Sequence, residues 1–205
     1  MTGAPLRVDA TSQGNLLLFD KAVKVSDFND LPDCLTYTGH DAGRACVPTA
    51  PLSDRSIFRA TNYPSAVATS NDRIVVTLAS YVNRHSSPDR GNCTPAGFSA
   101  TTGLNLYTGV GERNGCNNDI VVSVSTDAGA SFTGTTTPVA ELPSVSDENP
   151  RTQLADQWWQ WAALNPKGGV TVAYYDRKYG DAQQTGFMDI TMRRGNGNHV
   201  RVTNR

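Results

Sequence analysis

The residues of this sequence with the clearest chemical potential are those that proteins use to bind sugars. Aspartate and arginine side chains bind sugar hydroxyls or carboxylates, while tryptophan and tyrosine rings stack on the apolar faces of sugar rings. Such side chains gather in the second half of the chain, with one further position before it. The predicted substrate-binding residues are Arg59, Trp158, Trp159, Asp176, Arg177, Tyr179 and Asp181.

Most of these residues also have a structural alternative. Trp159 and Trp161 lie on one side of an expected strand and Trp158 on the other, because side chains alternate along a strand. We expect Trp161 to pack in a core between neighbouring sheets, and Trp158 or Trp159 to provide a platform on which a sugar stacks. Asp176 and Arg177 point to opposite sides of their strand, and a structural ion pair with neighbours explains them as well as a ligand does.

The stretch Ser125–Phe132 has the pattern S-x-D-x-G-x-S-F and follows an alternating segment. This pattern predicts a strand that runs into a tight hairpin. Asp127 can accept hydrogen bonds from backbone N–H groups, Gly129 supplies the positive φ of the bend, and Ser125 and Ser131 can bind its shoulders. Phe132 is expected in the core. An ordinary polar turn is the alternative, because D-x-G alone is common.

Short apolar or alternating segments separated by turn residues predict two antiparallel units. The expected strands of the first unit are Pro64–Thr69, Arg73–Tyr81, Asp119–Ser125 and Thr137–Leu142. Those of the second unit are Gln157–Leu164, Val170–Tyr175, Met188–Met192 and His199–Val202. No segment has a convincing helical period, and repeated four-stranded antiparallel units are typical of propeller blades. We predict an all-β chain that forms part of a β-propeller, with a β-sandwich as the alternative.

The remaining segments are expected to be loops or parts of a blade. Leu16–Phe19 and Ala22–Val25 predict a hairpin or an outer strand, and residues 26–56 predict a long ordered loop. Residues 83–118 predict a polar insertion in which His85 is solvated. The predicted division is a partial blade with a long loop (1–58), a first blade (59–142) and a second blade (156–205), which together make one truncated propeller domain.

The four cysteines form two local pairs, Cys34 with Cys46 and Cys93 with Cys116. Each pair spans a segment rich in glycine, proline or aspartate, and none of the cysteines has the close C-x-x-C spacing of a zinc site. We therefore favour two disulfides that close loops, which implies an oxidising compartment. Three pairings and buried free thiols remain open from the sequence.

The composition argues against several classes of protein. The 205 residues carry a formal net charge of −1, and the basic residues are scattered, so no pattern favours nucleic acid or an anionic membrane surface. No apolar run is long enough to span a membrane. The N-terminus lacks the pattern of a signal peptide, so we expect that a signal was removed or that the chain is a fragment. No metal or cofactor is predicted.

Several motifs resemble secreted actinobacterial proteins of the sialidase-like superfamily, which carry the name exo-α-sialidase. The Ser125–Phe132 stretch resembles the Asp-box repeat of bacterial neuraminidases. The other motifs are Asn62-Tyr-Pro-Ser65, Cys116-Asn-Asn-Asp-Ile120, Asp156-Gln-Trp-Trp-Gln-Trp-Ala162, and Tyr174-Tyr-Asp-Arg177 with Tyr179-Gly-Asp181. The resemblance extends from Arg59 to the C-terminus. It implies a six-bladed propeller, of which this chain holds two blades and part of another.

The resemblance also implies an activity on glycans. Sialidases are exo-glycoside hydrolases with a tyrosine nucleophile, a helping glutamate, an aspartate as acid/base and three arginines for the sugar carboxylate. Here Phe58-Arg-Ala-Thr61 keeps Phe-Arg of the family's Phe-Arg-Ile-Pro motif and loses Ile-Pro, and no glutamate lies beside a tyrosine in an expected strand. No catalytic residue is therefore assigned. The alternatives are a non-catalytic secreted propeller that binds glycan or protein, and a purely structural repeat segment.

Strand direction places the candidate residues at one end of the expected propeller. If the Ser125–Phe132 turn joins the third and fourth strands, antiparallel pairing places the connections between blades at the opposite end. Arg59, Trp158 and Trp159 lie where the chain enters a blade from such a connection, and residues 176–181 follow a second strand. We therefore expect ligand to bind at the end opposite the Ser125–Phe132 turn.

Overall fold

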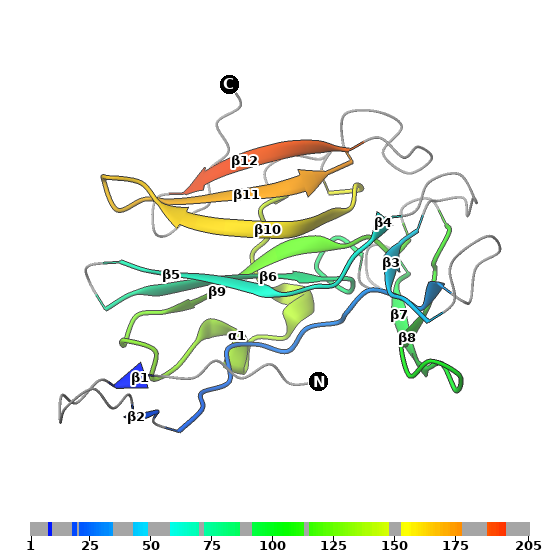
Figure 1. The fold of residues 1–205 in the computed structure, drawn as a ribbon, viewed down its shortest axis with the longest axis horizontal. Helices are drawn as coiled ribbons and strands as arrows, with labels where there is room; N and C mark the ends of the chain where they lie inside the picture. The colour runs from blue at the N-terminus through cyan, green and yellow to red at the C-terminus, as the bar shows by residue number, and fades with distance from the viewer. Residues whose placement is uncertain are drawn as a thin grey trace.

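The computed structural model describes residues 21–34, 43–48, 58–69, 72–86, 92–112, 115–147, 153–177 and 188–195, together with the backbone of residues 8–9 and 18–19. Two antiparallel sheets of three strands each lie one above the other (Figure 1). The first contains β5 (Pro64–Ala68), β6 (Ile74–Ser80) and β9 (Asp119–Ser125). The second contains β10 (Gln157–Leu164), β11 (Val170–Asp176) and β12 (Asp189–Gly195). The prediction of an all-β chain is confirmed.

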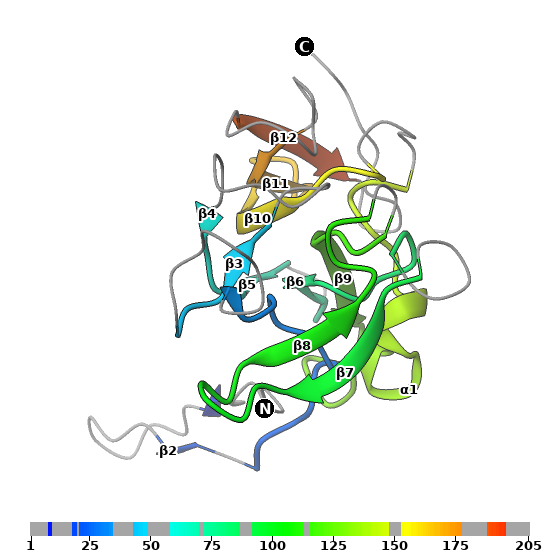
Figure 2. The same cartoon turned by 90° about the vertical axis from the view of Figure 1, so that its right-hand side faces the viewer.

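Three two-stranded ribbons accompany these sheets. They are β1 (Val8–Asp9) with β2 (Leu18–Phe19), β3 (Cys46–Val47) with β4 (Phe58–Arg59), and β7 (Thr94–Phe98) with β8 (Asn105–Thr108). Figure 2 shows the β7–β8 hairpin extending beside the sheets. The described helices are α1 (Thr133–Thr136) and a 3-10 helix (Val139–Glu141).

The main core lies between the two sheets. On β11 the buried side chains alternate, so Val170, Val172 and Tyr174 all point toward the first sheet. They pack with Ile120 and Val122 of β9 and with residues of β6. The other face of the first sheet is covered by a second cluster that includes Val25, Phe132 and Leu142. The first sheet is thus buried on both faces.

The outer face of the second sheet is apolar and exposed. Trp161, Ile190 and Met192 are 68%, 68% and 62% exposed. Trp161 and Met192 lie in one row across the sheet, because both align with Ala173. The expectation that Trp161 packs in a core between sheets is therefore wrong for the described part of the chain, in which its side chain is exposed.

The first sheet differs from the predicted four-stranded unit. Thr137–Leu142 is not a strand, because Pro138 begins a 3-10 turn in which the Glu141 N–H donates to the Pro138 carbonyl at 2.9 Å. The chain pairs with β9 only afterwards, where the Val122 N–H donates to Pro143 O at 2.9 Å and the Val145 N–H to Ile120 O at 3.0 Å. A short edge bridge thus takes the place of the fourth strand. The expected strand His199–Val202 lies outside the described residues.

Three further expectations need correction. Leu18–Phe19 pairs with β1 and not with Ala22–Val25, which is irregular and places Val25 in the core under the first sheet. The polar insertion contains the β7–β8 hairpin, which the sequence did not reveal because Pro95 and Gly97 are both unfavourable in strands. The predicted hairpin after β9 leads into α1 instead of a returning strand.

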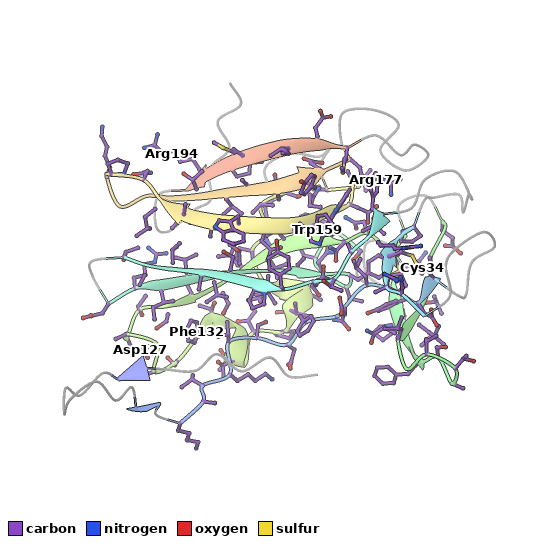
Figure 3. The ribbon with its side chains drawn as sticks, viewed as in Figure 1. Cys34, Asp127, Phe132, Trp159, Arg177 and Arg194 are labelled. Carbon is purple, nitrogen blue, oxygen red and sulfur yellow. A yellow bond between two sulfur atoms is a disulfide. The ribbon has the colours of Figure 1, made fainter. Side chains whose placement is uncertain are left out.

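The Ser125–Phe132 turn is a compact set of hydrogen bonds. The Ser125 hydroxyl donates to Asp127 Oδ1 at 2.7 Å, and Ser131 donates its hydroxyl to Oδ2 at 2.6 Å and its N–H to Oδ1 at 2.9 Å. The Gly129 N–H donates to Ser125 Oγ at 2.8 Å, and the φ of Gly129 is 90°. Phe132 is buried at the start of α1 (Figure 3). These contacts are the ones that the sequence pattern predicts.

The helix that follows this turn requires glycine at one position. A Cβ on Gly134 would lie 2.6 Å from the Val25 carbonyl oxygen and 2.7 Å from Ser26 Cβ. The Gly134 N–H donates to Ser123 Oγ at 2.9 Å, and that hydroxyl donates to Val25 O at 2.9 Å. The close approach therefore holds the segment around Val25 against β9.

Two disulfides join the predicted local pairs, Cys34–Cys46 and Cys93–Cys116. They close loops with sequence separations of 12 and 23 residues. On the chain-entropy argument each disulfide stabilises the fold by about 3 kcal/mol, because it restricts the unfolded chain. Two disulfides are compatible with an extracellular location.

We predict that Asp127 stabilises the fold only while it is ionised. Hydrogen bonds from Ser131 and Ser125 lower the pKa of Asp127 to about 2. Because the folded pKa lies below the unfolded value of about 4, this stabilisation is complete above pH 4 and is lost as the pH falls toward 2. Urea unfolding from pH 2 to 6 should give a stability difference between wild type and Asp127→Asn that shrinks below pH 4.

Thr126→Ala is the matched control, since Thr126 is exposed in the same turn. It should leave the pH dependence of the wild type unchanged. A stability difference for Asp127→Asn that stays constant down to pH 2 would contradict the role given to the carboxylate.

Candidate functional site

The two large sheets bring most of the predicted site residues to one end. At the turn end of the first sheet, Ala68 and Ser125 both align with Ile74. At the other end Ser80 aligns with Asp119, and there the Gln157 N–H of β10 donates to Asn118 O at 2.7 Å. Gln157 aligns with Asp176 in the second sheet. We call this the distal end; it lies opposite the Ser125–Phe132 turn.

Of the seven predicted residues, five lie at the distal end and two fall outside the described residues. Arg59, Trp158, Trp159, Asp176 and Arg177 are described, and Tyr179 and Asp181 are not. Figure 3 shows Trp159 and Arg177 away from Asp127. The five differ greatly in whether a ligand in solution can reach them.

Trp158 is part of the core and not a stacking platform. Its side chain is fully buried, with the Phe58 ring centroid at 5.0 Å and the Tyr175 ring stacked at 6.1 Å. The pairing of β10 with β11 shifts register between Trp158 and Trp161. Gln157 and Trp158 align with Asp176 and Tyr175 and are both buried, and the bulge that follows them brings Trp161 to the same face as Trp158, so simple alternation fails here.

Trp159 is the tryptophan that the distal end presents to solvent. It is 39% exposed, and its ring meets the Tyr175 ring nearly at a right angle, with centroids 5.6 Å apart. Its φ is 51°, a left-handed conformation that is unfavourable for a bulky side chain. Backbone strain of this kind persists only where the surroundings impose it, and it is frequent at functional sites.

Arg177 and Asp176 are buried and do not offer their charges to a ligand in solution. Arg177 donates from Nη1 to Pro48 O at 2.9 Å and to Asp156 Oδ2 at 3.3 Å, and its guanidinium lies 5.7 Å from the Phe58 ring centroid. The structural ion pair is therefore the role seen for Arg177. Burial raises the pKa of Asp156 to about 6, although the Arg177 charge and the Asn118 N–H oppose that shift.

Arg59 and Tyr63 complete the accessible part of the distal end. Arg59 is exposed on β4, and Tyr63 is partly buried just before β5. Burial and the nearby Tyr175 phenol raise the pKa of Tyr63. The Gln160 side-chain amide donates to the Tyr63 carbonyl oxygen, which ties Tyr63 to the strand that carries Trp159. The sequence did not indicate that Tyr175 belongs to this surface, because Tyr175 stood out only as part of the Tyr174–Arg177 motif.

A buried polar cluster lies beside this surface. Ser144 and Ser146 donate to Asp119 at 2.5 Å and 3.0 Å, and His85 Nε2 lies 3.9 Å from Asp119 and 3.0 Å from Asp147. The expectation that His85 is solvated is wrong, since it is 7% exposed. The three polar residues directly before Ile120 are the part of the sequence that could have indicated this cluster.

Burial controls the ionisation of Asp119. It raises the pKa of the carboxyl to about 7, against the opposing effects of the Ser144 hydroxyl, His85 and the Ser146 hydroxyl. The Ser146 hydroxyl also contacts Gln157 Oε1 at 3.0 Å, so the cluster connects to the start of β10. Because the cluster is buried, it supports the start of β10 and is not exposed to a substrate.

We predict that Asp119 makes the protein less stable as the pH rises. Its folded pKa is above the unfolded value of about 4, so its contribution is fully present below pH 4 and is lost as the pH rises through about 7. Asp119→Asn cannot ionise, and its stability relative to wild type should therefore increase between about pH 4 and pH 7 and stay level at higher pH. Chemical unfolding at several pH values measures this difference.

Ser146→Ala tests the same cause in the other direction. It removes a donor to the ionised carboxylate, so the folded pKa of Asp119 should rise further and the fall in stability should continue to a higher pH. Parallel stability curves for wild type and Asp119→Asn would show that Asp119 does not titrate in this range.

The described residues contain no group of three or more histidine, cysteine, aspartate or glutamate side chains arranged to hold a metal ion. In the same part of the chain, no helix is long and apolar enough to cross a membrane. Comparison of the chain with protein-family models, with curated proteins and with solved structures finds no match. Its function must therefore be argued from the site and from the sequence motifs.

Proposed function

We propose that this chain is part of a secreted, sialidase-like β-propeller that binds glycan at its distal end. The observation that carries the proposal is the exposed Trp159 ring, which packs against Tyr175 and has an unusual backbone conformation, at the same end of the sheets as the exposed Arg59. An aromatic ring next to a cation and hydroxyl groups suits a sugar, which has both an apolar face and polar substituents.

Three features of the fold support a propeller. Each large sheet is an antiparallel meander whose strands follow one another in sequence order. The two sheets pack face to face, as neighbouring blades do. The apolar outer face of the second sheet fits an architecture in which each blade packs against a neighbour on both sides.

The Ser125–Phe132 turn supports the assignment to Asp-box proteins. Its aspartate accepts hydrogen bonds from two serines, its glycine adopts a positive φ, and its phenylalanine enters the core. An Asp-box is a structural element, so this turn has no part in the proposed binding, which we place at the other end of the strands.

Binding is favoured over hydrolysis. A sialidase-type mechanism needs a tyrosine that can act as a nucleophile, assisted by a carboxylate. The pKa of Tyr63 is raised, as is that of the buried Tyr174, and a raised pKa disfavours the phenolate. Glu112 and Glu141 are exposed. We therefore place the non-catalytic binding function first and retain exo-sialidase activity as the second outcome of the test.

We predict that Trp159→Ala weakens glycan binding about ten-fold or more, because a stacked ring contributes roughly 1 to 3 kcal/mol. Trp161→Ala is the matched control, since Trp161 is exposed on the same strand but lies further from the distal end, where it aligns with Ala173. Binding of paired sialylated and neutral oligosaccharides is measured by calorimetry, and hydrolysis by release of the terminal sugar. Equal losses for both variants would contradict the proposed position of the site.

Arg59→Ala extends the same experiment. It should weaken binding of the sialylated ligand more than that of the neutral one, because a guanidinium pairs with the sugar carboxylate. Equal effects on both ligands would remove Arg59 from the proposed site. Release of sialic acid by the wild-type chain would establish the hydrolase in place of the binding protein.

The propeller proposal also predicts that the isolated chain associates with itself. The exposed face that includes Trp161, Ile190 and Met192 would be covered by another blade, and in its absence it favours contact between copies. Sedimentation velocity should therefore detect association at micromolar concentration, together with binding of the dye ANS. Ile190→Thr combined with Met192→Thr should reduce both. A wild-type monomer that binds no ANS would contradict this prediction.

A further inference from the structure

A pocket of about 210 Å³ lies on the side of the first sheet that faces away from the second sheet. It forms where the segment containing Val25 and Phe28 crosses β5 and β6. Ala66 of β5 aligns with Val76 of β6, and both line the pocket, as does Leu78. Because Ala66 is exposed, the pocket is open to solvent.

The lining of this pocket is apolar and offers little to a charged ligand. No charged side chain of the described residues lines it. The Ser26 hydroxyl already donates to Asp27 O at 2.7 Å, and the Asn62 side chain exchanges hydrogen bonds of 3.0 Å with that of Asn118. A polar group that entered the pocket would lose its hydration with few partners in return. An uncharged apolar group would gain from the burial.

The size of the pocket limits what can fill it. Buried apolar cavities of about 150 Å³ accept a benzene molecule. A volume of about 210 Å³ therefore holds one aromatic ring or a short alkyl chain, and is too small for a strand or helix of another protein. We propose that this pocket binds an aryl or short alkyl group of a small ligand.

The position of Tyr63 connects this pocket with the proposed glycan surface. Tyr63 lines the pocket, and its carbonyl oxygen accepts a hydrogen bond from Gln160, the neighbour of Trp159. Burial and the nearby Tyr175 phenol raise the pKa of Tyr63, and the Tyr175 ring contacts Trp159. Tyr63 is thus the reason to extend the proposal to a glycoside that stacks on Trp159 and places an apolar aglycone in the pocket. This last step rests on the proposed function, whereas binding of an apolar group alone does not.

The first test uses benzyl alcohol as the probe and two-dimensional ¹H–¹⁵N NMR of the full chain. We expect saturable shifts of the amide signals of β5, β6 and the segment around Val25. Ala66→Phe should fill the pocket and abolish these shifts. Ala68→Phe is the matched control, because Ala68 is exposed on the same face of β5 but does not line the pocket.

Two results of this test would overturn the inference. One is a set of shifts confined to the exposed face of Trp161, Ile190 and Met192. The other is a set of shifts around the pocket that persists in Ala66→Phe. If Ala66→Phe does not fold, Ala66→Leu fills part of the pocket and should weaken binding, and the map of shifts in the wild type decides by itself.

The second test compares benzyl and methyl α-sialosides. The benzyl compound should bind about five-fold more tightly or better, because burial of a ring is favourable. Ala66→Phe should remove this advantage without changing the affinity for the methyl compound. Failure of both sialosides, with benzyl alcohol still bound, would refute the proposed glycan function and leave the pocket standing. Equal affinity of the two sialosides would refute the link between pocket and glycan surface.

Discussion

Asn118 holds the distal ends of the two large sheets together. Its backbone N–H donates to Asp156 Oδ1 at 2.8 Å, and its carbonyl accepts the Gln157 N–H at 2.7 Å. Its side-chain amide donates to Gln157 O at 2.7 Å and exchanges hydrogen bonds with the Asn62 side chain. All of its polar groups are thus used in a buried position, where an unsatisfied group would be costly. The placement of β10, and hence of the aromatic surface, depends on this residue.

The same junction explains why charged residues near the distal end serve the fold. Asp156 accepts a hydrogen bond from the Asn118 N–H and pairs with the Arg177 guanidinium. It therefore fixes the start of β10 and the segment that follows β11. A buried pair of this kind tolerates the loss of neither partner, because the remaining charge would be uncompensated. The binding surface must therefore be built from the residues that this support leaves exposed, Arg59 and Trp159, with Tyr63 and Tyr175 at their side.

The sequence was sufficient for those features that depend on local patterns. Alternation predicted β6, β9 and β11, and the spacing of serine, aspartate and glycine predicted the hydrogen bonds of the turn after β9. It was insufficient where packing at a distance decides the outcome. Nothing local to His85 shows that two aspartates, 34 and 62 residues further along, enclose it. Likewise, the exposure of Trp161 depends on which segment covers its sheet.

The two adjacent tryptophans show how one irregularity decides between a core and a surface role. A regular strand would place Trp158 and Trp159 on opposite faces of the sheet, and either could then be the exposed ring. Trp158 is instead buried among Phe58 and Tyr175, and the bulge that follows it contains Trp159 with its positive φ. That conformation costs about 1 to 3 kcal/mol, whereas burial of a large apolar side chain contributes about 1.5 to 3 kcal/mol. The two magnitudes are similar, so the burial of Trp158 can sustain the strain at Trp159. The exposed ring is thus held in place by the buried one.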